Sequence, residues 1–140
     1  MDIEFECGIG WKRLYQPIID KIDSLNETLP EDKQIKILQI KEKFAGLRIY
    51  LENANEELMK MVHEAESESY QVCERCGTSE NVGILNTGGW YYNCCQECAK
   101  KLIKNAQDCW KDRKMFWRNS KTNEMFEITT LNNEFKKITK

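Results

Sequence analysis

The chain has 140 residues, of which 41% are hydrophobic and 31% charged, and its formal net charge is −2. This size suits one compact domain, or one domain with an appended module, and excludes two large independent cores. No apolar run approaches the roughly 18 residues of a membrane-spanning helix, and the first eight residues are acidic where a signal peptide would be basic. We therefore expect a soluble, unprocessed protein of the cytoplasm.

Charge is unevenly distributed along the chain. Residues 1–98 carry 10 Lys and Arg against 18 Asp and Glu, whereas residues 99–140 carry 11 against 5. The last third is therefore a candidate docking surface for an anionic partner. The alternative is a solvated helix face followed by a basic tail.

The first half of the chain predicts a helix, two strands and a second helix. Apolar residues at helical spacing predict a helix over residues 11–25, which Pro17 either delays to about Gln16 or kinks. Residues 35–43 and 47–52 predict two antiparallel strands joined around residues 44–46. Asn53 and Glu56 are spaced as in a capping box, and a helix is expected from there to about residue 69. We assign residues 1–70 to a small α+β core domain.

Two pairs of cysteines carry the strongest chemical signal. Cys73 and Cys76 form one Cys-x-x-Cys pair, and Cys95 and Cys98 form another after an 18-residue interval. This spacing is typical of a structural zinc site with four thiolate ligands, so we predict a bound Zn²⁺ ion. Cys94 is an alternative to Cys95, but only Cys95 repeats the spacing of the first pair.

The residues around these cysteines predict a zinc module at residues 71–104. The interval reads as a hairpin with a glycine turn, and the second cysteine pair opens a helix. A knuckle, a hairpin and a helix in that order are typical of a treble-clef or zinc-ribbon arrangement. Helical spacing of apolar residues from Ala99 to Trp117 extends this helix, so residues 105–140 are predicted to be a basic amphipathic helix and a tail. Short apolar alternations in residues 119–140 leave two alternatives for the tail, a strand pair or a partly ordered segment.

No catalytic constellation is apparent in the sequence. The single histidine, His63, falls off the apolar stripe of its helix and is expected to be exposed. A nucleophile, a base and an orienting group are needed together for acyl transfer, and four sulfur ligands leave zinc no open position for water. Seven cysteines, an odd number, suit a reducing compartment better than a disulfide scaffold. We expect a protein that is not an enzyme.

Several motifs together resemble a family of small, uncharacterised phage and prophage proteins. They are Gly10-Trp11, residues 39–50 (QIKEKFAGLRIY), the CERCG segment at residues 73–77, Gly89-Trp90 and the second cysteine pair. That family typically has a GW opening, a VKEKFGGLRFY-like hairpin and a CxxCG…GW…C zinc module, and Ala45 stands here where the family often has glycine. The resemblance spans about residues 8–100 and implies a setting, the bacterial cytoplasm during phage infection or from a prophage.

The first functional hypothesis is a phage accessory protein that acts by stoichiometric binding. It would inhibit or sequester a component of bacterial antiviral defence, either a host protein or a nucleotide signal. Aromatic rings stack on bases and arginine forks onto phosphates, which makes candidate contacts of Lys43, Arg48, Trp90, Tyr91 and Tyr92. The alternative is that Trp11, Phe44, Trp90 and Tyr92 only join the zinc module to the core.

Two further hypotheses remain open. A nucleic-acid-binding module would present the basic residues after the cysteines to a phosphate backbone, namely Lys100, Lys101, Lys104, Lys111, Arg113, Lys114 and Arg118. In that case Trp110, Phe116 and Trp117 would add base stacking to a bound single strand. A metal-dependent nuclease or hydrolase would use acidic groups and a transient metal. The oligomeric state, the identity of the partner and the order of residues 119–140 do not follow from the sequence.

Overall fold

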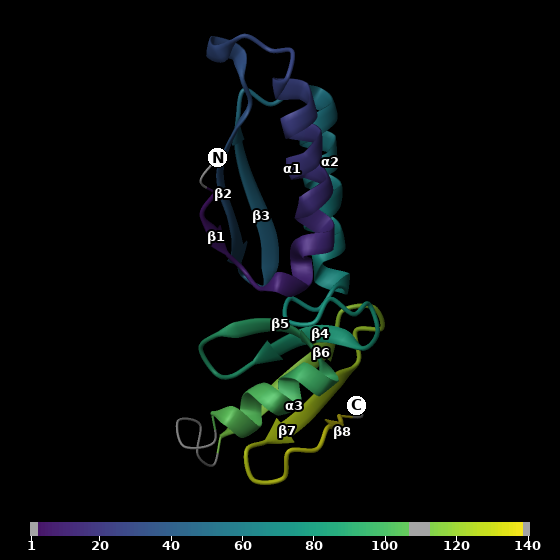
Figure 1. Ribbon diagram of the computed structural model, residues 1–140. Helices are drawn as coiled ribbons and strands as arrows, with labels where there is room; N and C mark the ends of the chain where they lie inside the picture. Colours follow the sequence, from purple (N-terminus) through teal and green to yellow (C-terminus); the bar gives the residue numbers. More distant parts are fainter. Residues whose placement is uncertain (1–2, 107–112, 139–140) are drawn as a thin grey trace.

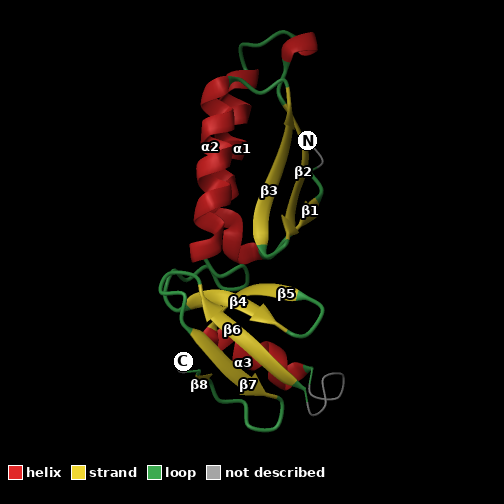
Figure 2. Cartoon of the chain, turned by 180° about the vertical axis from the view of Figure 1, so that it is seen from behind, coloured by secondary structure: helices red, strands yellow, loops and turns green. Residues whose placement is uncertain are grey.

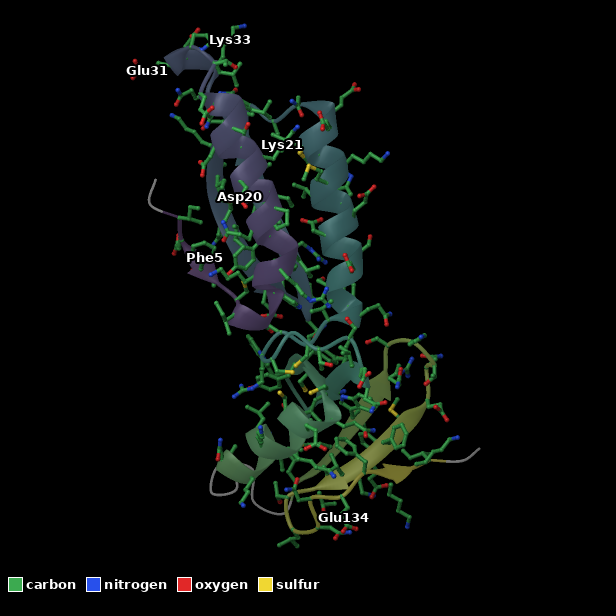
Figure 3. All side chains as sticks on the ribbon, turned by 45° about the vertical axis from the view of Figure 1, so that its right-hand side comes forward. Phe5, Asp20, Lys21, Glu31, Lys33 and Glu134 are labelled. Carbon is green, nitrogen blue, oxygen red and sulfur yellow. The ribbon has the colours of Figure 1, made fainter. Side chains whose placement is uncertain are left out.

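The computed structural model describes residues 3–106 and 113–138 and is a mixed α+β protein with two β-sheets. Each sheet occupies one half of the molecule, with α1 and α2 in one half and α3 in the other (Figure 1). Figure 3 places Glu31 and Lys33 at one end of the molecule and Glu134 at the other. The predicted α+β class is confirmed.

The first half is a three-stranded sheet covered on one face by two helices. β1 (Phe5–Glu6) pairs in parallel with β2 (Lys36–Lys43), which pairs antiparallel with β3 (Gly46–Glu52). α1 (Lys12–Asn26) and α2 (Glu56–Glu68) lie side by side against the sheet in both Figure 1 and Figure 2. Three short 3-10 helices complete this half: η1 (Ile9–Trp11), η2 (Glu31–Lys33) and η3 (Ser69–Gln71).

The two helices form for the reasons that the sequence indicates, with differences at their starts. α1 begins at Lys12 and continues through Pro17, so the start near Gln16 that we considered is wrong. α2 is capped by Asn55, whose side-chain oxygen accepts a 2.8 Å hydrogen bond from the Leu58 N–H. The predicted cap, Asn53, is wrong: its φ is +64°, and its amide donates to the Gln34 carbonyl instead.

The second half is a five-stranded antiparallel sheet with α3 (Gln96–Asn105) packed on one face. The strand order is β5-β4-β6-β7-β8. The strands are β4 (Val82–Asn86), β5 (Tyr91–Cys95), β6 (Lys114–Asn119), β7 (Met125–Thr129) and β8 (Lys136–Lys137). A second core lies between α3 and this sheet. At its centre, Ile103 of α3 is buried together with Leu85, Met115 and Trp117 of the sheet.

The long basic helix that we predicted after the cysteines is wrong beyond Asn105. Residues 114–119 form a strand, in which Met115 and Trp117 are fully buried while Lys114 and Arg118 are exposed. The spacing of Trp117 from the apolar residues of α3 fits a period of three to four residues, whereas burial along residues 114–119 alternates with the period of two that a strand requires. Residues 107–112, with Trp110 and Lys111, lie outside the described part of the chain.

The C-terminal segment is part of the same sheet as the hairpin formed by β4 and β5. β6 pairs with β4, so strands on both sides of the domain boundary predicted after residue 104 share one sheet and one core. Over the described residues, no helix is long and apolar enough to cross a membrane.

Candidate metal centre and hairpin junction

Four cysteine side chains converge at the point where the two halves of the molecule meet. Cys73 and Cys76 lie in the loop between η3 and β4, Cys95 ends β5, and Cys98 lies in the first turn of α3. Their sulfur atoms all lie within 4.8 Å of one another. These four residues, which we call the cysteine cluster, are those that the sequence predicted as ligands.

The cluster has dimensions that a tetrahedral metal ion requires. The sulfur atoms of Cys76 and Cys95 are 3.8 Å apart. A tetrahedral zinc ion with bonds of about 2.3 Å holds its ligands about 3.8 Å apart. Cys73 and Cys95 are buried and Cys76 is exposed, so the site lies just beneath the surface. The residues therefore fit a metal ion held by four thiolates.

The backbone around the cluster is shaped to present the sulfur atoms. Gly77 has φ = +82°, a conformation that glycine adopts without strain, and its N–H donates to the Cys73 carbonyl at 2.9 Å. On the other side, Cys95 caps α3, and its sulfur accepts a 3.4 Å hydrogen bond from the Cys98 N–H. The positive end of the α3 dipole thus faces the sulfur atoms.

Cys94 lies outside the cluster, although it neighbours Cys95. Successive residues of a strand point to opposite faces, and Cys94 is fully buried in the second core, with its sulfur 3.9 Å from the Tyr92 carbonyl oxygen. Burial raises the pKa of the Cys94 thiol well above its ordinary value. The preference for Cys95 over Cys94 as the cluster member is confirmed.

The clustered thiols differ in their affinity for protons. Burial, with hydrogen bonding to Cys95 next, raises the pKa of Cys98, and burial also raises the pKa of Cys95. At Cys73, burial acts in the same direction but is outweighed by backbone N–H donors from Cys76, Cys95 and Arg75, so its pKa is lowered. A divalent cation completes such a site by displacing the remaining protons.

The first cysteine pair is bonded to the first half of the molecule. The Gly10 N–H donates to the Glu74 carbonyl at 2.8 Å, and the Trp11 indole N–H donates to the Val72 carbonyl at 2.8 Å. The approach is so close that a Cβ on Gly10 would lie 2.3 Å from the Cys73 carbonyl oxygen. The Gly-Trp pair therefore docks the loop at residues 73–76 onto the first half of the molecule, which is the joining role that the sequence left open for Trp11.

A second candidate site lies between the tips of the two hairpins. Lys43, Trp90 and Tyr91, three of the predicted contact residues, line a cavity of about 300 Å³ together with Phe44. An adjoining cavity of about 410 Å³ shares Phe44 and Tyr91 and is completed by Ile84, Asn86, Phe116, Arg118 and Met125. We call the two cavities together the hairpin groove.

The other two predicted contact residues lie elsewhere. Arg48 contacts η3, where its guanidinium donates to the Tyr70 hydroxyl at 3.1 Å, and it also donates to the Leu47 carbonyl at 2.8 Å. Tyr92 lies on the α3 side of the sheet, packed against the second core. Arg48 and Tyr92 therefore do not share a surface with Lys43, Trp90 and Tyr91.

The basic residues proposed for nucleic-acid binding do not form one surface. Lys100, Lys101 and Lys104 belong to α3. Lys114 and Arg118 lie on β6 and point away from α3, because the intervening Trp117 points toward it. The Arg113 guanidinium donates to the Thr87 carbonyl at 3.0 Å. His63 is exposed on α2, as expected.

Sequence reasoning considered Phe44 and Phe116 singly but did not predict that they meet Arg118 in the hairpin groove. The available signal was the two-residue turn, since Lys43 pairs with Gly46 and both intervening residues have positive φ. No protein-family model matches the chain, and neither a curated protein nor a solved structure is significantly similar to it.

Proposed function

We propose that this protein is a non-catalytic binding protein that is held together by one structural zinc ion and captures its partner at the hairpin groove. The observation that carries the proposal is the meeting of aromatic rings from two separate hairpins. Phe44 is 74% exposed, Trp90 59% and Tyr91 49%, and all three line the groove. Exposed aromatic residues gathered at one place mark binding sites in soluble proteins.

The cysteine cluster supports zinc as the resident metal. Four sulfur ligands at tetrahedral spacing suit zinc and leave no position for a reactive water molecule. The order of the cysteine knuckle, the β4–β5 hairpin and α3 supports a treble-clef arrangement. The ion would fix the base of the hairpin whose tip carries Trp90 and Tyr91, so its role is structural.

The resemblance to phage and prophage proteins supports a setting for this binding. We propose a phage accessory protein of the bacterial cytoplasm that inhibits or sequesters a component of antiviral defence, either a host protein or a nucleotide signal. A stoichiometric inhibitor gains affinity from a preformed surface, and the presence of the hairpin groove between two hairpins supports such a role.

The test is native mass spectrometry of the full chain purified from infected bacteria, before and after denaturation. We expect one zinc ion in the wild type and in a Trp90→Ala/Tyr91→Ala variant, and a retained partner in the wild type alone. Retention of nothing by either protein would contradict the proposal. Conversion of a retained molecule into product would contradict its non-catalytic part.

A further inference from the structure

The hairpin groove is divided into two lobes by aromatic side chains. The lobes of about 410 Å³ and 300 Å³ share Phe44 and Tyr91, so these two residues stand at the boundary with open volume on both sides. Each volume lies at the lower end of the range for small-molecule sites, roughly 300–1,000 Å³. The groove therefore suits small planar groups in contact with aromatic rings.

Phe44 is held in an unusual conformation that keeps its ring exposed. Its φ is +52°, in the left-handed region that bulky residues rarely adopt, and Ala45 beside it has φ = +66°. These values are those of the type I′ turn that joins β2 to β3 in register. Backbone strain of this kind persists where the surrounding structure enforces it, and it is found often at ligand sites.

Cationic groups lie at both ends of the groove. Arg118 lines the larger lobe, and Lys41 and Lys43 line the smaller one. Among the residues that line the two lobes, Glu42 carries the one acidic group, and its carboxylate already accepts a 2.8 Å hydrogen bond from the Ala45 N–H. The groove thus combines aromatic surfaces with an excess of positive charge, although the chain as a whole has a net charge of −2.

The floor of the groove is the face of the second sheet that α3 does not cover. Ile84 and Asn86 of β4 and Phe116 and Arg118 of β6 alternate with core residues and so point to this face. An open antiparallel sheet that presents aromatic side chains is a surface on which nucleobases stack. Stacking on aromatic rings and pairing of phosphate with Lys or Arg occur together in sites for single strands.

From this arrangement we propose that the hairpin groove binds a nucleobase together with its phosphate, as a free nucleotide or as part of a single strand. The base stacks on Phe44 or Tyr91, and the phosphate contacts Arg118 at one end or Lys41 and Lys43 at the other. This proposal rests on the proposed binding function and specifies its ligand.

The test is titration of the whole 140-residue chain, loaded with zinc, with defined probes, followed by NMR or calorimetry. The probes are adenosine 5′-monophosphate, adenosine, ribose 5-phosphate and a short single-stranded poly(dA) oligonucleotide. We expect the monophosphate to bind more tightly than adenosine or ribose 5-phosphate, with an affinity that falls as salt rises. A free nucleotide as the natural ligand predicts similar affinities for the monophosphate and the oligonucleotide, and a single strand predicts much tighter binding of the oligonucleotide.

Two groove variants and two control variants make the test specific to this site. Phe44→Asn keeps the left-handed turn and removes the ring, and we expect it to weaken binding about tenfold, the loss of one base–aromatic stack. Arg118→Gln should reduce the dependence of binding on salt. Lys33→Ala, at the far end of the molecule, and Tyr50→Ala, an exposed aromatic residue outside the groove, should bind as the wild type does.

The results separate this inference from the function on which it rests. Binding of ribose 5-phosphate as tight as that of the monophosphate would overturn base recognition, and no binding of any probe would overturn the inference entirely. If no probe binds while a host protein is retained through Trp90 and Tyr91, the inference fails and the binding function stands. If a probe binds and is then hydrolysed, the groove stands and the non-catalytic function fails.

Discussion

The side-chain amide of Asn93 donates a 3.1 Å hydrogen bond to the carbonyl of Ala45, which joins β5 to the turn between β2 and β3. The same amide donates to the Ser69 carbonyl at 3.0 Å. Asn93 is buried, and its register opposite Ile84 places it on the groove face of the sheet. The Asn93 side chain therefore fixes the position of the turn that carries Phe44 relative to the hairpin formed by β4 and β5.

Replacing Asn93 by Asp should strongly destabilise the protein. The carboxylate has the same shape but donates no hydrogen bond, so two carbonyl groups lose their partner and a charge is buried beside them. We expect a loss of about 3 kcal/mol or more in the free energy of unfolding at neutral pH, measured by denaturant titration. An unchanged denaturation midpoint would show that Asn93 does not hold the two hairpins together.

Phe44→Asn should stabilise the protein while it removes the ring from the groove. A left-handed conformation costs an ordinary L-residue about 1–2 kcal/mol, and asparagine tolerates it better than phenylalanine. Because the Phe44 ring is 74% exposed, its removal sacrifices little burial. We expect a gain of about 1 kcal/mol in the free energy of unfolding. A clear loss of stability would mean that the ring packs against the sheet more firmly than its exposure indicates.

Gly10→Ala should separate the loop at residues 73–76 from the first half of the molecule. A methyl group there would lie 2.3 Å from the Cys73 carbonyl oxygen and 2.5 Å from that of Glu74, both backbone atoms that cannot turn aside. We expect a cost of about 2–3 kcal/mol from this overpacking, measured by thermal or denaturant unfolding. Gly89→Ala is the matched control, since a methyl group there meets no atom within 4 Å and should change stability little.

Metal uptake should release protons at neutral pH. Thiols bind zinc as thiolates, and burial raises the pKa of Cys98 and Cys95 in the metal-free protein, so these groups carry protons that zinc must displace. We expect proton release on adding zinc to the metal-free protein in weak buffer, and loss of zinc as the pH falls. Zinc uptake without proton release at pH 7 would contradict the raised pKa values.

The same raised pKa values should make the metal-free protein less stable as the pH rises. This is opposite to the zinc-bound protein, which loses zinc as the pH falls. A thiol whose pKa is higher in the folded state than its ordinary value of 9.0 favours folding while it stays protonated. That contribution is fully present below about pH 9 and is lost as the pH rises through the folded-state pKa. The metal-free protein should therefore lose stability at alkaline pH, whereas the zinc-bound protein should lose it in acid.

The local patterns in the sequence predicted much of the fold and of the cysteine cluster. The Cys-x-x-Cys spacing requires only a turn and a helix start to bring its sulfur atoms together. The alternation of apolar and polar residues over residues 47–52 predicts a strand, because a helix would not produce a period of two. The helix predicted after Asn105 is wrong because Trp117 fits the helical period of Ala99 and Ile103 by coincidence. The helix ends at Asn105, and Trp117 lies on a strand. Phe44, Tyr91 and Arg118 come together in the hairpin groove only through tertiary packing, so no local sequence pattern predicts the groove.

The most direct test of the proposed zinc site is the metal content of the purified 140-residue protein, measured by native and then denaturing mass spectrometry. We expect one zinc ion per chain of 16.6 kDa, lost on denaturation, and no stoichiometric zinc in Cys95→Ser. Cys94→Ser should keep its zinc, because Cys94 lies in the core and outside the cluster. A folded wild-type protein without zinc, or a Cys94→Ser variant that loses zinc while Cys95→Ser keeps it, would contradict this account.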